Sequence, residues 1–227
     1  MSKVLILDCD GVFAHTTQAH LNAANAAFAQ VGLDLRWDGA MYARVSLTAG
    51  FRGQVLAYFG RFGWPGGEAD NGDLITAVET AHMRHFISTV RAGEVPLRDD
   101  LGQLIDAAVA AGWTLAVCTD DHADLASACI SRLGLSRASA IGVVAGSDSG
   151  HTPRPDSAIY ETIAGLLGVD LDGAHAIVSK PFGAMAAKAA GIDVSVLVGT
   201  QANPAAYGGG HLIQSLDTGP GGLKLAA

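Results

Sequence analysis

Two carboxylates separated by one residue are the strongest chemical signal in the sequence. Asp8 and Asp10 follow the apolar run of residues 4–7, and Gly11 comes directly after them. Because close carboxylates repel each other, such a pair calls for a cation or a shared proton. The pattern predicts either a site for a hard metal ion such as Mg²⁺, or a nucleophilic acid beside a second acid that transfers protons. A strand that simply ends in a polar turn is the alternative.

The apolar run before these acids is typical of a strand buried on both faces of a parallel sheet. Further along, helices and strands alternate, which predicts right-handed crossovers between parallel strands. Such open sheets carry their active sites at the carboxyl ends of the strands. The expected strands cover residues 4–7, 114–119, 140–145, 174–178 and 194–198, with a last short element at 211–216.

The expected helices cover residues 16–30, 37–47, 53–62, 73–90, 98–111, 121–133, 155–167 and 182–190. The first four lie together and contain no buried strand, so they form an insertion that can cover the carboxyl edge of the sheet. The expected fold class is α/β: a doubly wound parallel sheet with an inserted helical cap. Residues 1–14 and 91–227 form the Rossmann-like core, and residues 15–90 form the cap.

The composition excludes several classes of function. Hydrophobic residues make up 49% and charged residues 16% of the 227 residues, as in a compact globular protein. The net charge of −8 argues against nucleic acid as a partner. No apolar stretch reaches the ~20 residues of a membrane span. Three cysteines without metal-type spacing predict buried, reduced thiols and a cytoplasmic protein.

Several segments then follow the opening pair in a characteristic order. The chain resembles the haloacid dehalogenase superfamily, which opens with D-x-D-G-T/V after its first strand, and within it the CbbY-like, β-phosphoglucomutase-like subgroup. That superfamily has a helical cap inserted after the first motif. Besides the opening motif, the resemblance rests on residues 15–20, 25–28, 32–38, 41–44, 112–119, 153–160 and 186–192.

The resemblance implies roles for three residues. Asp8 is the nucleophile that forms an aspartyl-phosphate, and Asp10 is the general acid and base. Thr119 closes a later strand and donates its hydroxyl to a phosphate oxygen. A Mg²⁺ ion at Asp8 and Asp10 would offset the repulsion between the nucleophile and the phosphate.

Two later motifs depart from the family pattern. Thr152 fills the position of the family's lysine before P-x-P-D, and Val178 and Ser179 fill the two acidic positions of the fourth motif. With one carboxylate and one carbonyl left as ligands, Mg²⁺ binding is expected to be weak or absent. Lys180 is the candidate to place an ammonium near Asp8. A solvated loop lysine is the alternative.

The expected cap and the loop after Thr119 supply candidate substrate contacts. His20 keeps the family's residue type, and Arg52 aligns with a basic residue that reads the sugar phosphate and can bind an anion through two hydrogen bonds. Asp120 is a further candidate contact; a helix cap or loop residue is the ordinary interpretation of an acid there, and a replacement metal ligand is the alternative.

Four other polar residues have an ordinary structural interpretation. Asp121 and Asp148 suit helix caps or loops, with a role as replacement metal ligands as the alternative. His82 and His85 lie three apart on an expected helix, and without a third ligand we interpret them as surface or capping residues.

Three hypotheses remain open from the sequence. The first is a hydrolase, a phosphatase for a small phosphorylated metabolite such as a sugar phosphate, acting as a monomer or homodimer. The second is a catalytically impaired relative that binds a ligand or a partner. The third is a metal-independent hydrolase that uses Lys180 beside the nucleophile.

Overall fold

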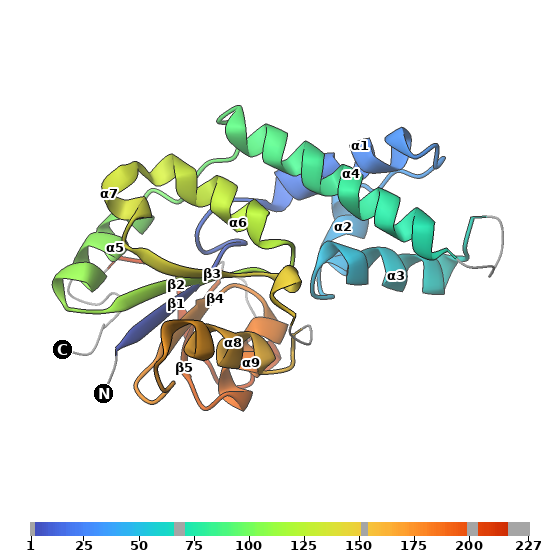
Figure 1. Cartoon of the computed structure of the whole chain (residues 1–227). Coiled ribbons are helices and arrows are strands. Elements are labelled where there is room, and N and C mark those ends of the chain that lie inside the picture. The colour runs from blue at the N-terminus through green and yellow to red at the C-terminus, as the bar shows by residue number, and fades with distance from the viewer. Residues whose placement is uncertain (1–2, 66–70, 151–153, 199–203, 218–227) are drawn as a thin grey trace.

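The structure, a computed structural model, describes residues 3–65, 71–150, 154–198 and 204–217. Its strands are β1 (Val4–Asp8), β2 (Thr114–Cys118), β3 (Ile141–Ala145), β4 (His175–Val178), β5 (Asp193–Leu197) and β6 (His211–Ile213). They form one parallel sheet in the order β3-β2-β1-β4-β5-β6 (Figure 1). The expected α/β class with a doubly wound parallel sheet is confirmed.

Strand β1 lies in the middle of this sheet, and all five of its residues are buried. Leu5 and Leu7 belong to one apolar cluster and Val4 and Ile6 to another, as the alternation of side chains along a strand requires. Asp8 pairs with the last residue of β2. The loops that follow β1, β2 and β4 therefore leave the same edge of the sheet.

Helices cover both faces of the sheet (Figure 1). α5 (Leu101–Ala110), α6 (Ala123–Ile130) and α7 (Leu135–Ala138) lie over the face of Leu5 and Leu7. α8 (Ala158–Leu167) and α9 (Pro181–Ala189) lie over the opposite face. Both faces of β1 are thus removed from water, which explains its uninterrupted apolar sequence.

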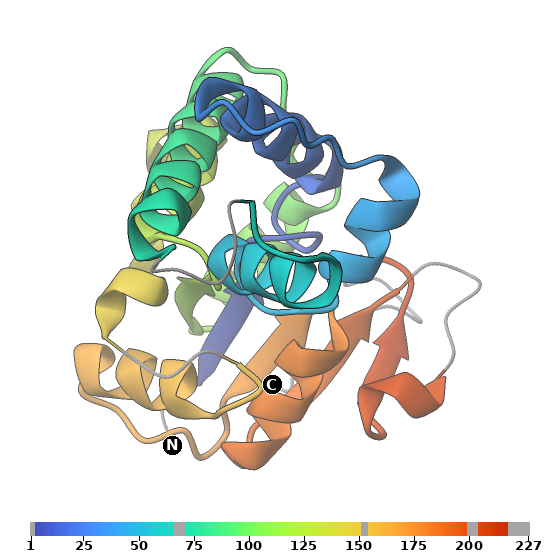
Figure 2. The same cartoon turned by 90° about the vertical axis from the view of Figure 1, so that its right-hand side faces the viewer.

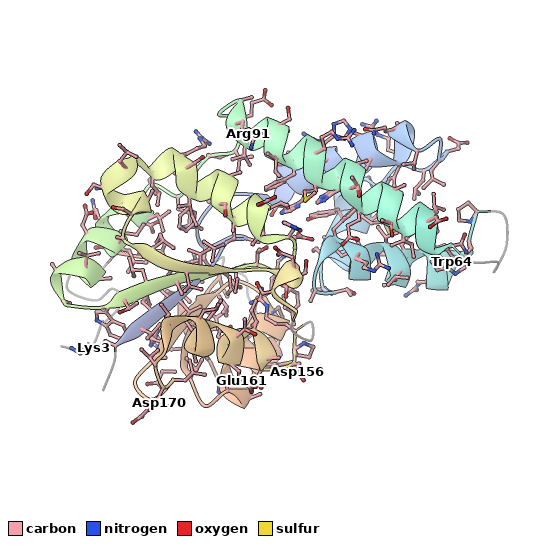
Figure 3. The ribbon with its side chains drawn as sticks, in the orientation of Figure 1. Lys3, Trp64, Arg91, Asp156, Glu161 and Asp170 are labelled. Carbon is pink, nitrogen blue, oxygen red and sulfur yellow. The ribbon has the colours of Figure 1, made fainter. Side chains whose placement is uncertain are left out.

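Four helices sit beyond the carboxyl end of the sheet: α1 (Thr17–Gln30), α2 (Gly39–Val45), α3 (Phe51–Phe62) and α4 (Gly72–Arg91). They have their own apolar cluster, in which Trp37 and Phe28 are fully buried. Figure 2 shows α3 in front of the sheet's end, and in Figure 3 Trp64 lies at the far side of this unit while Lys3 lies at the opposite end of the molecule. The C-terminal half of α4 also packs on the core through Phe86 and Val90.

The strands and the expected helices follow one another as the sequence predicts, but α7 was not expected and the bounds of several helices differ. The helix expected from Trp37 begins at Gly39, because the Asp38 side chain accepts a hydrogen bond from Met41 N at 2.7 Å. The helix expected from residue 155 begins at Ala158, whose N–H donates to the carboxylate of Asp156. In both places a short acidic side chain accepts a hydrogen bond from one of the first free N–H groups of the helix. This hydrogen bond fixes the residue at which the helix begins.

Other bounds shift by a few residues. The helix expected over 98–111 begins at Leu101, the one over 121–133 becomes α6 and a 3₁₀ turn (Ser131–Leu133), and the last element is the strand β6. Further 3₁₀ turns cover Ser147–Ser149 and Pro204–Tyr207. In the part of the chain that the structure describes, no helix combines the length and the apolar character needed to cross a membrane.

Candidate active site

Asp8 lies at the base of a cavity of about 200 Å³ between the edge of the sheet and helices α1, α2 and α3. The residue is 2% exposed. Its Oδ1 accepts hydrogen bonds from Arg154 Nη1 at 2.5 Å and from the Cys118 thiol at 3.1 Å. Burial raises the pKa of Asp8, while the Arg154 guanidinium acts to lower it. These two hydrogen bonds therefore fix the orientation of the Asp8 carboxylate beside the positively charged guanidinium.

Arg154 bridges two carboxylates. Its Nε and Nη2 atoms donate to the two oxygens of Asp120 at 2.7 and 2.6 Å, and Nη1 donates to Asp8. The side chains of Arg154 and Asp8 are 3% exposed and that of Asp120 is 8% exposed. The ring of Phe182 lies 5.3 Å from the guanidinium carbon. The cation that the sequence analysis sought at Lys180 is supplied by Arg154.

Asp10 forms a second pair with a residue of the helical insertion. Its Oδ1 lies 2.9 Å from Nε2 of His20 on α1. Burial alone would raise the pKa of Asp10, but the charge and hydrogen bond of His20 outweigh it and hold that pKa below its usual range. Conversely, burial would lower the pKa of His20, and Asp10 raises it. The hydrogen bond between Asp10 and His20 joins α1 to the loop after β1.

The loop after β4 approaches the loop after β1 closely. Ser179 Oγ donates to the backbone oxygen of Asp10 at 2.7 Å, while Val178 is 1% exposed and belongs to the core. Gly11 has φ +78°, and a Cβ there would lie 2.7 Å from Ser179 Oγ. Only glycine can adopt this positive φ without a side chain that collides with Ser179, which explains why Gly11 follows the two acids. Thr152, in the position of the family's lysine, lies outside the described residues.

Among the described residues, one group of three side chains could hold a metal ion. The ligand atoms of Asp10, His20 and Asp121 all lie within 4.8 Å of one another. Asp8, which the sequence analysis paired with Asp10 as a ligand, is not in this group. The donor set therefore differs from the expected one, with an imidazole and a second acid in place of the nucleophile.

Asp121 also caps a helix from across the cavity. Its Oδ1 accepts a hydrogen bond from Phe51 N, the first residue of α3, at 2.7 Å. Burial raises the pKa of Asp121 to about 6. Asp148 accepts a hydrogen bond from Ala123 N at 2.8 Å at the start of α6. The interpretation of Asp121 and Asp148 as helix caps is confirmed.

The remaining predicted site residues are divided between the cavity and its surroundings. Lys180 lines the cavity and, within the described part of the chain, its side chain takes part in no hydrogen bond or ion pair. Thr119 is 1% exposed, accepts a hydrogen bond from Asp121 N and lies 3.5 Å from Asp10 Oδ2. Arg52 is half exposed, pairs with Glu79 at 3.0 Å and does not line the cavity. The structure gathers Asp8, Asp10, His20, Asp120 and Lys180 around one space and leaves Arg52 outside it.

Two residues of the site escaped the sequence analysis. Arg154 stands between the two prolines of P-R-P-D and lies two positions from Thr152. A cationic residue so close to the position where the family has a lysine could have indicated that Arg154 takes its place. His82 is 1% exposed, and its interpretation as a surface or capping residue is wrong. It follows Ile75 and Val78 along the buried face of α4, and that helical spacing places it inside.

Three features together define a class of hydrolase: an acid pair after the central strand, a cation bonded to the first acid, and a helical insertion that covers the edge of the sheet. The model of the haloacid dehalogenase-like hydrolase family matches residues 2–191, and the chain belongs to this family.

Within this family the similarity is to CbbY proteins, so the sequence-based assignment to the CbbY-like subgroup is confirmed. Protein CbbY of Cupriavidus necator is 36% identical over 201 residues, which cover 86% of this chain and 77% of that protein. A CBBY-like protein of Arabidopsis thaliana is 32% identical over 198 residues, and the match spans 85% of this chain and 62% of the relative's length.

A solved structure has the same fold along nearly the whole chain. CbbY from Rhodobacter sphaeroides in complex with phosphate superposes with a TM-score of 0.84 at 27% identity, covering 96% of this chain and 97% of that one. A mutant of that protein in complex with xylulose 1,5-bisphosphate gives a TM-score of 0.82 at 27% identity, covering 95% of each chain.

Proposed function

We propose that the protein is a phosphatase that acts on a small phosphorylated metabolite, with sugar phosphates as the substrate class. The observation that carries the proposal is the Asp8 carboxylate at the end of the central strand, bonded to a buried guanidinium at the base of a cavity. The complexes of Rhodobacter sphaeroides CbbY with phosphate and with xylulose 1,5-bisphosphate support the choice of substrate class.

The chain's own residues suggest the following reaction. Asp8 attacks phosphorus, and in the described part of the chain its Oδ2 accepts no hydrogen bond, which leaves a lone pair for attack. Asp10, whose carboxylate receives a proton from His20, gives that proton to the leaving oxygen. Water then attacks the aspartyl-phosphate, and Asp10 takes the proton that the water loses. Arg154 stabilises the charge that builds up on the phosphoryl oxygens.

Arg154, rather than Mg²⁺, is the cation of this proposal. A metal held by Asp8 and the carbonyl of Asp10 would need two atoms that already have donors: Asp8 Oδ1 is bonded to Arg154, and Asp10 O accepts from Ser179. Val178 faces the core and offers no ligand. These residues do not fit a Mg²⁺ ion at that place, so we propose that Mg²⁺ binds weakly or not at all.

The cavity needs additional positive charge to admit a phosphate. Four acids line it, against two basic side chains that are always charged and one histidine: Asp8, Asp10, Asp120, Asp121, Arg154, Lys180 and His20. Arg154 is already shared between two acids, so Lys180 is the side chain able to attract an anion from solvent. We propose that Lys180 binds the incoming phosphate, that His20 and Asp120 border the substrate, and that residues 15–90 act as the cap.

A second candidate function has its own support. Arg154 donates to Asp8 from one side of its guanidinium and to Asp120 from the other. These hydrogen-bond donors are therefore engaged with protein carboxylates and are not open to a phosphate. A catalytically impaired relative would keep this network and use the cavity to bind an anion. The alternative differs from the first proposal in one measurable respect, turnover.

A phosphatase screen decides between them. Purified protein is incubated with sugar phosphates, including xylulose 1,5-bisphosphate, with Mg²⁺ or with a chelator, beside Asp8→Asn as the matched inactive control. Turnover that survives the chelator and disappears in Asp8→Asn supports the proposal. Turnover that requires Mg²⁺ contradicts the role given to Arg154. Binding of xylulose 1,5-bisphosphate without turnover on the whole panel supports the second candidate.

Compartment and assembly complete the proposal. Cys9, Cys118 and Cys129 are free and buried, which suits a reducing cytoplasm. We propose a cytoplasmic monomer or homodimer, and sedimentation at several protein concentrations tests the assembly state.

A further inference from the structure

Three side chains lead from the cavity into the helical insertion. His20 Nε2 lies 2.9 Å from Asp10 Oδ1, and His20 Nδ1 lies 3.2 Å from His82 Nε2. The planes of the two imidazole rings differ by 11° and their centroids are 5.2 Å apart. The rings are therefore nearly parallel, and one nitrogen of each lies within hydrogen-bond distance of the other ring. Because His20 uses both nitrogens, a proton can arrive at one and leave from the other.

Aromatic rings hold both histidines in place. Phe51 stacks on His82 with 3.7 Å between ring centroids, and Phe86 stacks on His20 at 4.2 Å. His82 is 1% and His20 6% exposed. Burying polar rings costs free energy unless they are hydrogen-bonded, and an apolar residue would fill the same space without that cost. The histidines are thus placed for hydrogen-bond chemistry.

His82 also lines a second cavity, of about 220 Å³, between α4 and the loop leading into α6. Glu79 and His122 line the same cavity, and their side chains are 40% and 41% exposed, so water reaches it. Asp10 and His20 line the first cavity. The three hydrogen-bonded side chains therefore connect two neighbouring cavities, which share Asp121 in their linings.

We propose that Asp10, His20 and His82 form a proton relay between the catalytic cavity and water in the second cavity. The proposal rests on the phosphatase reaction given above. When Asp10 takes the proton of the attacking water, His20 gives its Nδ1 proton to His82 Nε2, and His82 releases its other ring proton to water. When Asp10 later protonates the leaving oxygen of the next substrate, one proton returns to His20 by the same path. The Asp10–His20 pair stays neutral in both stages, and each cycle consumes no proton.

The surrounding charges favour these positions for the protons. Burial would lower the pKa of His20, but Asp10 raises it, whereas burial and the neighbouring charge on His20 keep the pKa of His82 well below its usual value. His20 therefore binds a proton more readily than His82 does, which suits His82 as the group that accepts the proton of His20 and passes it on. Other titratable groups also face the relay: Arg154, Tyr42 and Cys9 beside Asp10, Asp121 and Cys129 beside His20, His85 beside His82, and Glu79 and His122 on the second cavity.

Two variants of His82 separate proton transfer from positioning. His82→Gln keeps an acceptor for His20 but cannot carry a proton, and His82→Leu removes both properties. His85→Gln is the matched control, because His85 lies on the same helix, is exposed and bonds to Gln30 at 2.9 Å. With the best substrate of the wild type, kcat should fall about tenfold in both His82 variants, whereas the initial burst of leaving-group release and the His85→Gln rate should not change. Wild-type kcat in His82→Gln overturns the relay and leaves a positioning role.

An NMR titration of the imidazole rings tests the coupling without any turnover. In Asp10→Asn, the pKa of His20 should fall, and the pKa of His82 should rise because its neighbour is no longer charged, while His85 should titrate as in the wild type. A His82 titration that does not respond to Asp10→Asn overturns the relay. If the wild type hydrolyses no phosphate ester, the proposed function fails, and this titration alone decides whether the three groups are coupled.

Discussion

Replacing Arg154 by methionine tests the ion network at the base of the cavity. The substitution leaves the side chains of Asp8 and Asp120 buried, 3% and 8% exposed, without their counter-ion. Removing one partner of a buried ion pair typically costs about 3–5 kcal/mol, because a buried charge is left uncompensated. Methionine fills most of the space of the arginine's aliphatic part, so a cavity contributes little. The free energy of unfolding of Arg154→Met should therefore fall by about 3–5 kcal/mol.

Urea unfolding of the wild type and two variants measures this loss. The matched control is Arg137→Met, because Arg137 also forms a two-bond pair, with Asp106 at 3.0 and 2.6 Å, but on the exposed surface. A solvated pair gains little from its Coulomb attraction, so the loss in Arg137→Met should be much smaller. The comparison measures what burial and a second carboxylate add, since the Arg154–Asp120 and Arg137–Asp106 pairs have similar geometry.

The stability loss in Arg154→Met should depend on pH in a direction that the pKa of Asp8 sets. Without Arg154, the pKa of Asp8 should rise further in the folded protein than burial already raises it. The folded state then binds a proton more tightly than the unfolded chain, so the loss in Arg154→Met should shrink as pH falls from about 8 to about 5. Adding Asp120→Asn should recover part of the stability. A loss below about 1 kcal/mol, the size of a surface pair, or a loss that does not change with pH, would refute the assignment of Arg154 as the buried cation.

Four further outcomes follow from the geometry. Because burial raises the pKa of Asp121 from 3.8 to about 6, the wild type should lose stability as pH rises through this range, and thermal melts of Asp121→Asn should show a flatter dependence. Gly50 has φ +68° and a Cβ there would lie 2.8 Å from the backbone oxygen of Asp120, so Gly50→Ala should lower the melting temperature more than Gly32→Ala, where φ is +78° and nothing lies within 4 Å. Lys180→Ala should raise KM for a phosphate ester several-fold and weaken its salt dependence, with an unchanged melting temperature. Asp120→Asn should tighten inorganic phosphate binding in calorimetry, because it removes a negative charge from the cavity and frees an edge of the guanidinium; weaker binding would contradict that reasoning.

The sheet and the main acids could be predicted because their signals are local. An uninterrupted apolar run ending at Asp8 specifies a buried central strand, and its carboxyl end specifies where the side chain lies. Glycines and acids mark the helix limits to within a few residues. Asp10 comes two residues after Asp8 and therefore lies at the same edge of the sheet.

The cation could not be predicted in the same way, because its position depends on how a loop folds back. Lys180 and Arg154 both belong to loops at the sheet's edge, and sequence spacing does not say which side chain turns inwards. In the structure, Arg154 bonds to Asp8 at the end of β1 and to Asp120 in the loop after β2, and it lies over the ring of Phe182 in α9, so partners from three segments fix its position. Lys180 has none of these contacts. Likewise, the contact between His20 and His82 joins residues 62 positions apart, which no local pattern reports.

Asp120 connects the two candidate functions physically. The group of Asp8, Asp120 and Arg154 sums to one negative charge when both acids are ionised, so the guanidinium is fully engaged before any ligand enters. An incoming phosphate must then take a hydrogen bond away from Asp120, or bind through Lys180 and His20 alone. In the first case Arg154 stabilises charge in the transition state and the chain is a hydrolase. In the second, the phosphate is held away from the attacking oxygen and the chain only binds it. How strongly Asp120 holds Arg154 in competition with phosphate thus decides which chemistry this site performs.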